Sequence, residues 1–226
     1  MCFLYVLTVM PIFMKRPFLT LLITAICLQT IAQVYTSPEL EDRKKNQKTM
    51  AILPALAPVE MTRRQLKDLS PEQIMAMQDN SSLAFQKTLY TWLTTKGYGN
   101  TLEVQDPVVT DSLLAAAHLS VKDVIYGQKT DIARVLGVDV LLSASVHSQE
   151  DASGSTYMGA GGSMYVGPDF PTLQITLNMA IYDGQDGDRL WEYEGERNGG
   201  YERYADKKTM DKLIARVYKM YPYKRN

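Results

Sequence analysis

The sequence predicts a single-domain α/β protein: a mixed β-sheet flanked by helices, with an antiparallel hairpin and an amphipathic helix near the C-terminus. Three observations lead to this prediction. Short apolar runs of strand length alternate with helix-length segments in the first half of the domain. Two alternating segments joined by a turn follow in the second half. The last segment carries apolar residues at helical spacing.

The N-terminal segment is typical of a cleavable secretory signal. Lys15 and Arg16 precede an apolar run over residues 18–28, and Thr30-Ile31-Ala32 supplies small residues before Gln33. The run is far shorter than the roughly 20 residues that a membrane-spanning helix needs. We therefore expect cleavage after Ala32 and no membrane-spanning helix in the mature chain.

The export prediction has further consequences. Residues 1–13 are also apolar, which indicates that translation starts at Met14. Lipid attachment at Cys27 stays an alternative to cleavage after Ala32. A lipoprotein needs a small residue just before its modified cysteine, whereas the bulky Ile26 precedes Cys27. Because Cys2 and Cys27 both precede the expected cut, the mature chain has no disulfide and no cysteine-bound metal. We expect an exported protein, in the periplasm or at the periplasmic face of the outer membrane.

The chain divides into a signal region with an upstream extension (1–32), a polar linker (33–47) and an α/β domain (48–226). Its length is sufficient for a self-supporting core. The formal net charge of -1 at pH 7 leaves no basic excess. Composition therefore argues against a nucleic-acid partner, because phosphates require clustered lysine and arginine.

The first half of the domain is expected to alternate strands and helices. Residues 49–53 form an apolar run that stops at Pro54, as a buried strand does. Ser70-Pro71-Glu72 opens a helix that runs to Lys96. A helix interrupted at Asp79-Asn80 is an alternative. The later elements are a strand at 102–104, a helix at 111–118 capped by Thr110, a helical turn opened by Ser120 and Asp123, and a helix at 131–136 closed by Gly137.

The second half is expected to form antiparallel strands. In the strand at 140–146, alternate residues from Val140 face one way, whereas Ser143, Ser145 and His147 face the other. Residues 153–171 are rich in glycine and predict a long loop. The remaining elements are a strand at 173–181, a turn at 183–188, a strand at 189–195 with Trp191 and Tyr193 on one side, and a helix at 210–221.

Several phrases together resemble a known group of envelope proteins. They are the strand that ends in Ile52-Leu53-Pro54, the helix-to-strand step over 131–146 and the hairpin over 181–191. In this order they resemble the curli-export lipoprotein family CsgG and the amino-terminal domain of TolB. The resemblance covers roughly residues 48–220 and implies one α/β domain with a role in assembly, secretion or protein contacts, without catalysis.

One departure from that group concerns the outer membrane. Curli-export relatives insert long hairpins, in which each strand needs about 9–11 residues of alternating apolar character. The loop at 153–171 is too short and irregular for such a pair, which argues against a pore. A ring-forming secretion component is nevertheless an alternative that the resemblance leaves open, together with a homo-oligomer.

Few residues are available for catalysis. The chain has two histidines, His118 at an expected helix end and His147 at a strand end. Ser143 and Ser145 share a strand face with His147, which leaves an exported serine-type hydrolase as an alternative. However, no G-x-S-x-G elbow surrounds either serine.

Other motifs are weaker. The glycines of 153–171 lack a phosphate-binding fingerprint, and the aspartates of 183–188 depart from calcium-loop spacing, so a hairpin turn explains them better. We therefore predict no catalytic residues, no cofactor and no metal. The partner is expected to be a protein or an envelope polymer, because tyrosine and arginine are frequent at contact surfaces. The expected contact residues are Tyr157, Tyr165, Phe170, Arg197, Tyr201, Arg203 and Tyr204.

Overall fold

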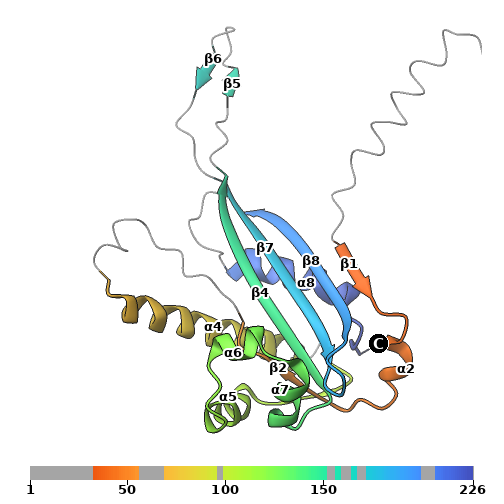
Figure 1. Ribbon diagram of the computed structural model, residues 1–226. Coiled ribbons are helices and arrows are strands. Elements are labelled where there is room, and N and C mark those ends of the chain that lie inside the picture. The colour runs from red at the N-terminus through yellow and green to blue at the C-terminus, as the bar shows by residue number, and fades with distance from the viewer. Residues whose placement is uncertain are drawn as a thin grey trace, which may run out of the picture. The chain divides into compact units, whose positions relative to one another are not determined.

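A mixed sheet of six strands forms the centre of the protein, in the order β1-β8-β7-β4-β2-β3 (Figure 1). The computed structural model describes residues 33–55, 69–95, 99–151, 156–158, 164–166, 172–199 and 207–225. These residues all belong to one compact unit. The predicted fold class, a mixed sheet flanked by helices with a C-terminal hairpin and helix, is confirmed.

The sheet has a parallel part and an antiparallel part. β2 (Thr49–Ile52) lies parallel to β3 (Glu103–Val104) on one side and to the start of β4 (Val140–Asp151) on the other. β4 continues antiparallel to β7 (Thr172–Asp183), which pairs with β8 (Arg189–Gly199). Connections between the parallel strands contain helices, as the geometry of parallel strands requires.

Helices cover both faces of the sheet. One face packs against α4 (Pro71–Thr94) and α8 (Lys207–Met220), which bury Leu89 and Leu213 in the larger core. The other face packs against α5 (Pro107–Ala116), α6 (Val121–Tyr126) and α7 (Lys129–Leu136) in a smaller core. Adjacent residues of β4 therefore enter different cores: Leu142 the larger and Leu141 the smaller.

Local signals placed several helix ends correctly. Ser120 and Asp123 form a reciprocal capping box at the start of α6, and Gly137 ends α7 in the left-handed conformation at φ 67°. Ser70 caps α4 as expected, with Gln73 completing its capping box. The expected end of that helix, Lys96, lies outside the described residues.

The structure settles one open point about the helices and corrects one predicted helix start. α4 runs without a break through residues 79–80. α5 begins at Pro107, because Asp106 accepts a hydrogen bond from the Val108 N–H and proline suits the first helical position. Thr110, the expected cap, is instead buried within the helix, where its Oγ1 donates to Gln105 at 2.8 Å.

Two regions expected to lack regular structure contain short elements. The expected linker at 33–47 includes β1 (Gln33–Thr36), paired with β8, and α2 (Leu40–Arg43), whose Leu40 enters the larger core. All four residues of β1 are exposed, so no apolar pattern marks this strand. Within the expected loop at 153–171, β5 (Thr156–Met158) and β6 (Met164–Val166) pair as a separate two-stranded sheet.

Candidate binding surface

One face of the antiparallel strands is polar and lies open beyond the smaller core. The inward residues of β4 are buried, but Ser143 and Ser145 are half-buried and His147 is exposed, as strand alternation predicted. Figure 1 shows α5, α6 and α7 gathered where β4 begins, so they cover only that end of the face. We call the rest, from Ser143 outward, the open face.

Strand register aligns the open-face residues in rows across the sheet. In one row, Ser145 lies opposite Asn178, which lies opposite Glu194. In the next row, Ser143 lies opposite Ala180, which lies opposite Glu192. On β1, Gln33 extends the first row and Tyr35 the second. The open face is therefore four strands wide and becomes acidic toward β8.

A shallow hollow of about 260 Å³ lies in this face. Its centre is formed by small side chains, because serine and alanine on neighbouring strands leave the backbone close to the surface. Tyr182 and the two glutamates of β8 stand at its margins. The lining residues are Ser143, Ala144, Ser145, Asn178, Met179, Ala180, Tyr182, Glu192 and Glu194.

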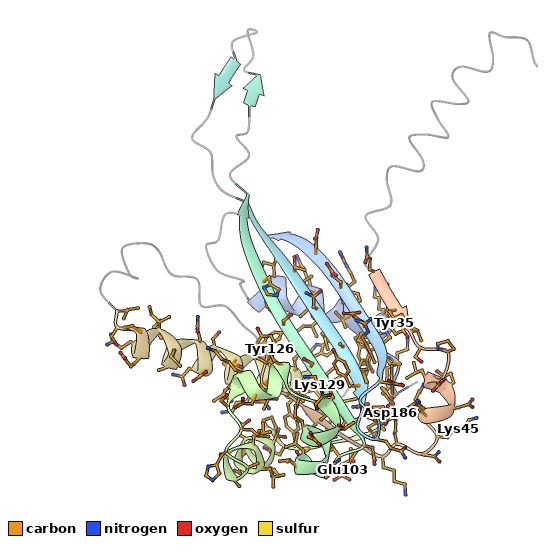
Figure 2. The ribbon with its side chains drawn as sticks, viewed as in Figure 1. Tyr35, Lys45, Glu103, Tyr126, Lys129 and Asp186 are labelled. Atoms are coloured by element: carbon orange, nitrogen blue, oxygen red, sulfur yellow. The ribbon has the colours of Figure 1, made fainter. Side chains whose placement is uncertain are left out.

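Charged groups frame the hollow at two margins. Arg189 pairs with Glu192 and lies over the Tyr35 ring, with 5.1 Å between its Cζ and the ring centroid. At the end near the helices, the Lys129 ammonium lies 5.6 Å from the centre of the Tyr182 ring and donates to two carbonyls of α6. Burial lowers the pKa of Lys129. Figure 2 labels Tyr35 on β1 and Lys129 at the start of α7.

The geometry offers no support for a serine nucleophile on this face. No hydrogen bond joins either serine to His147 among the described residues. Ser145 and His147 lie two residues apart on an extended strand, roughly 6.6 Å along its axis, and neither sits on a sharp turn. His118 follows α5 in a left-handed conformation at φ 56° and is exposed, as expected of a helix end.

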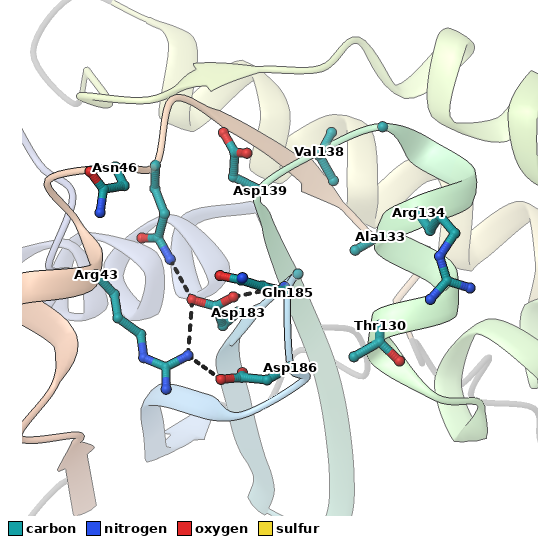
Figure 3. Close-up of a pocket in the computed structure, with 13 residues that line it drawn as sticks. Arg43, Asn46, Thr130, Ala133, Arg134, Val138, Asp139, Asp183, Gln185 and Asp186 are labelled. Carbon is teal, nitrogen blue, oxygen red and sulfur yellow. Dashed lines mark hydrogen bonds and ion pairs between the residues drawn. The ribbon is translucent and has the colours of Figure 1, made fainter.

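A second hollow, about 760 Å³ and broadly open, lies at the turn between β7 and β8 (Figure 3). Asp183 is only 6% exposed and accepts hydrogen bonds from Gln47 Nε2 at 2.9 Å and from the Gln185 N–H at 2.7 Å. Arg43 Nη1 lies 3.3 Å from Asp183 Oδ2 and also donates to Asp186. The Tyr223 hydroxyl donates to Gln47 Oε1 at 2.5 Å, so Gln47 links Tyr223 to Asp183.

The turn aspartates thus surround a guanidinium from α2. Arg43 contacts Asp183, Asp186 and Asp188, and also Glu39, the residue that precedes α2. Partial burial acts to raise the pKa of Asp186, but hydrogen bonds from the Asp188 N–H and from Arg43 outweigh it and lower that pKa. Because the carboxylates are engaged with Arg43 and the turn backbone, this arrangement attaches α2 to the sheet.

The residues predicted as a partner surface are only partly described. Tyr157 and Tyr165 lie opposite each other in the β5–β6 pair. Arg197 lies in β8 opposite Ile175. Phe170, Tyr201, Arg203 and Tyr204 lie outside the described residues. Sequence reasoning missed Glu192 and Glu194, whose place beside the hollow follows from strand pairing.

The described residues add two general findings. No group of three or more histidine, cysteine or acidic side chains among them is arranged to hold a metal ion. Over the same part of the chain, no helix combines the length and the apolar character needed to cross a membrane.

Comparisons with known proteins give weak likenesses in fold. No protein-family model and no curated protein matches the chain. Similar solved structures include lipoprotein GNA1162 from Neisseria meningitidis, with 11% identity, a TM-score of 0.45 and coverage of 76% of this chain and 96% of that one. A PelC dodecamer from Paraburkholderia phytofirmans has 15% identity, a TM-score of 0.41 and coverage of 83% and 95%.

The LpoB C-terminal domain from Escherichia coli is also similar, with 14% identity, a TM-score of 0.38 and coverage of 72% and 94%. The likeness to these solved structures concerns the fold alone and carries no argument about activity or partners. It does not extend specifically to the curli-export family or to TolB, so that narrower resemblance stays a prediction.

Proposed function

We propose that this chain is an exported, non-enzymatic binding or assembly protein whose open face contacts a protein or an envelope polymer. The observation that carries the proposal is the row structure of that face: polar, four strands wide, hollowed at its centre and acidic at one side. Export rests on the signal sequence, and the periplasm or the periplasmic face of the outer membrane is the proposed location.

The face has the chemistry of a contact surface. Hydroxyl, amide and carboxylate groups of Ser145, Asn178 and Glu194 line up in one row and can each take part in hydrogen bonds with a partner. Small central side chains allow a partner's backbone or side chain to approach closely. The tyrosines of β5 and β6, with the other predicted contact residues, belong to the same proposal as a second contact region.

Site-specific photo-crosslinking in cells tests the proposal. A photoreactive residue replaces Ser145 in one strain and Lys122, exposed on α6, in a matched control strain. We expect an adduct with one partner from position 145 and none from position 122. A third strain carries the photoreactive residue at Tyr157, in the second contact region. The absence of a specific adduct from both position 145 and position 157 would contradict the proposed function.

A second variant tests the hollow itself. Ala180→Trp places an indole over the hollow and is expected to reduce the adduct from position 145 about tenfold, the scale of a buried contact. Thr88→Trp, on the exposed side of α4, is the matched control and should leave the adduct unchanged. An adduct that joins two copies of this chain would identify the partner as a homo-oligomer.

A further inference from the structure

The outer edge of β8 is only partly paired. β1 lies opposite Trp191–Glu194 and ends there, with Gln33 opposite Glu194. Residues 195–199 continue β8 and pair with β7 on their inner side. Among the strands that the structure describes, none pairs with the outer side of 195–199. If the predicted cleavage holds, Gln33 is also the first residue of the mature chain, which then supplies no further residue to extend β1.

This edge has backbone groups available for pairing. Along an extended strand, N–H and C=O groups point alternately to the two sides, so part of those in 195–199 point away from β7. Five residues span about 16 Å of strand. Such an edge is a template on which an extended segment of another protein can add as a further strand.

The side chains beside the edge indicate the chemistry of that segment. Glu194 and Glu196 are exposed on the open-face side of β8. On the opposite side, Gly195 is buried and provides no side chain of its own, and the Tyr193 ring lies against it. Side chains of an added strand would alternate between these two environments. Lysine or arginine suits the acidic side, and small apolar side chains suit the side next to Tyr193.

The edge of β4 beyond the end of β2 is also unpaired among the described strands, but its described side chains do not indicate the charge of a partner. β2 pairs with β4 only as far as Leu142, and no described strand pairs with the same side of β4 from Ser143 onward. The described side chains there are Ser143, Ala144, Ser145, Val146 and His147. They include no carboxylate or lysine that would select a partner by charge, whereas β8 offers two glutamates.

We propose that β8 binds an extended protein segment along 195–199, as an added strand with basic side chains at alternate positions. This inference rests on the proposed function and names the partner's chemistry: a protein segment of about five residues in β conformation. The added strand would continue the sheet directly beyond the end of β1 and would extend the acidic side of the open face.

Peptide binding to the mature chain, beginning at Gln33, tests the inference. The probe is a capped six-residue peptide that alternates valine and lysine. One control peptide has glutamate in place of lysine, and another has every backbone nitrogen methylated, so that it cannot donate backbone hydrogen bonds. We expect only the first peptide to slow amide exchange in 195–199, by about tenfold at saturation.

Matched variants test the charge selection. Glu196→Lys should weaken binding of the lysine peptide about threefold and favour the glutamate peptide, the scale of an opposite-charge pair across two strands. Glu103→Lys, an exposed glutamate on the edge strand β3, should change neither affinity. Unchanged far-UV circular dichroism would show that both variants keep the fold.

Equal protection by the lysine and N-methylated peptides, or none by either, would overturn the strand-addition inference. Adducts from position 145 would still support the proposed function in that case. Conversely, loss of all specific adducts together with selective peptide protection would overturn the open face as the contact surface and leave the β8 edge as the binding element.

Discussion

At the scale of single residues, Tyr193 and Gly195 form a local unit on the core side of β8. A Cβ atom on Gly195 would lie 2.3 Å from the Tyr193 hydroxyl oxygen, so the tyrosine ring occupies the space that glycine leaves. The hydroxyl is buried and has no hydrogen-bond partner within the described part of the chain. Burial without a partner costs free energy and also raises the pKa of Tyr193.

Removal of that hydroxyl should therefore stabilise the protein. Tyr193→Phe is expected to raise the free energy of unfolding by up to about 1 kcal/mol, because an unpaired polar group leaves the core. Tyr218→Phe is the matched control: its hydroxyl donates to the Gly99 carbonyl at 3.0 Å, so its loss should cost about 1 kcal/mol. Urea denaturation measures both, and a destabilised Tyr193→Phe would show that the hydroxyl is satisfied.

Arg43 links stability to pH. The pKa of Asp186 is lower in the folded protein than its ordinary value of 3.8. Such a carboxylate stabilises the folded state above its unfolded pKa, and the contribution is lost as pH falls through the folded pKa. Arg43→Met removes the guanidinium from Asp183 and Asp186 and should lower the melting temperature at pH 7.

The Arg43→Met deficit should shrink as the pH falls below 3.8, the ordinary pKa of Asp186, and should be lost as the pH falls through the lower pKa of Asp186 in the folded protein, because the protonated carboxyl no longer needs a cation. Thermal denaturation between pH 3 and pH 7 measures this. Lys45→Met removes an exposed pair with Asp42 and should change stability by less than about 0.5 kcal/mol. A deficit of Arg43→Met that does not depend on pH would contradict the electrostatic role.

At the scale of elements, α4 has two unlike halves. Residues 71–80 are exposed except for the half-buried Ile74, whereas Phe85, Leu89 and Leu93 pack in the larger core. Figure 1 shows the first half of the helix extending beyond the sheet. Its capping box and helix-favouring residues support the helix there locally.

The two capping serines should therefore respond differently to substitution. Ser70→Ala is expected to speed amide exchange in 71–80 several-fold and to leave the melting temperature unchanged, because that segment opens locally. Ser120 caps α6, which contains the buried Val124. Ser120→Ala removes this cap and should lower global stability by about 1 kcal/mol. Hydrogen exchange and calorimetry measure these effects, and equal losses of global stability would contradict the distinction.

At the scale of the whole molecule, one sheet joins two cores. Leu141 and Leu142 are adjacent and fully buried, yet they face opposite cores. Because β4 contributes to both, neither core can lose its packing without disturbing the strand between them. We therefore expect a single cooperative unfolding transition.

Substitution of these two leucines checks the cooperativity. Leu141→Ala and Leu142→Ala should each cost about 2–5 kcal/mol, through lost burial and the cavity left behind. Each should shift the same urea transition by circular dichroism and by tryptophan fluorescence, with an unchanged slope. Transitions that separate between the two probes would show that the cores unfold independently.

Much of this architecture follows from local sequence signals. Alternation in 140–146 and 173–181 placed Ser143, Ser145 and His147 on the face away from the larger core, and capping patterns located α6 and the end of α7. These signals are readable because they depend on residues within one or two turns of each other.

Only the tertiary structure decided which distant residues meet. The row from Ser145 through Asn178 to Glu194 depends on the register of three strands. The free edge of β8 depends on the length of β1, a short strand of exposed residues with no apolar signal. Strand order is set by contacts between segments far apart in the chain, whereas local alternation determines only which face of the sheet each residue takes.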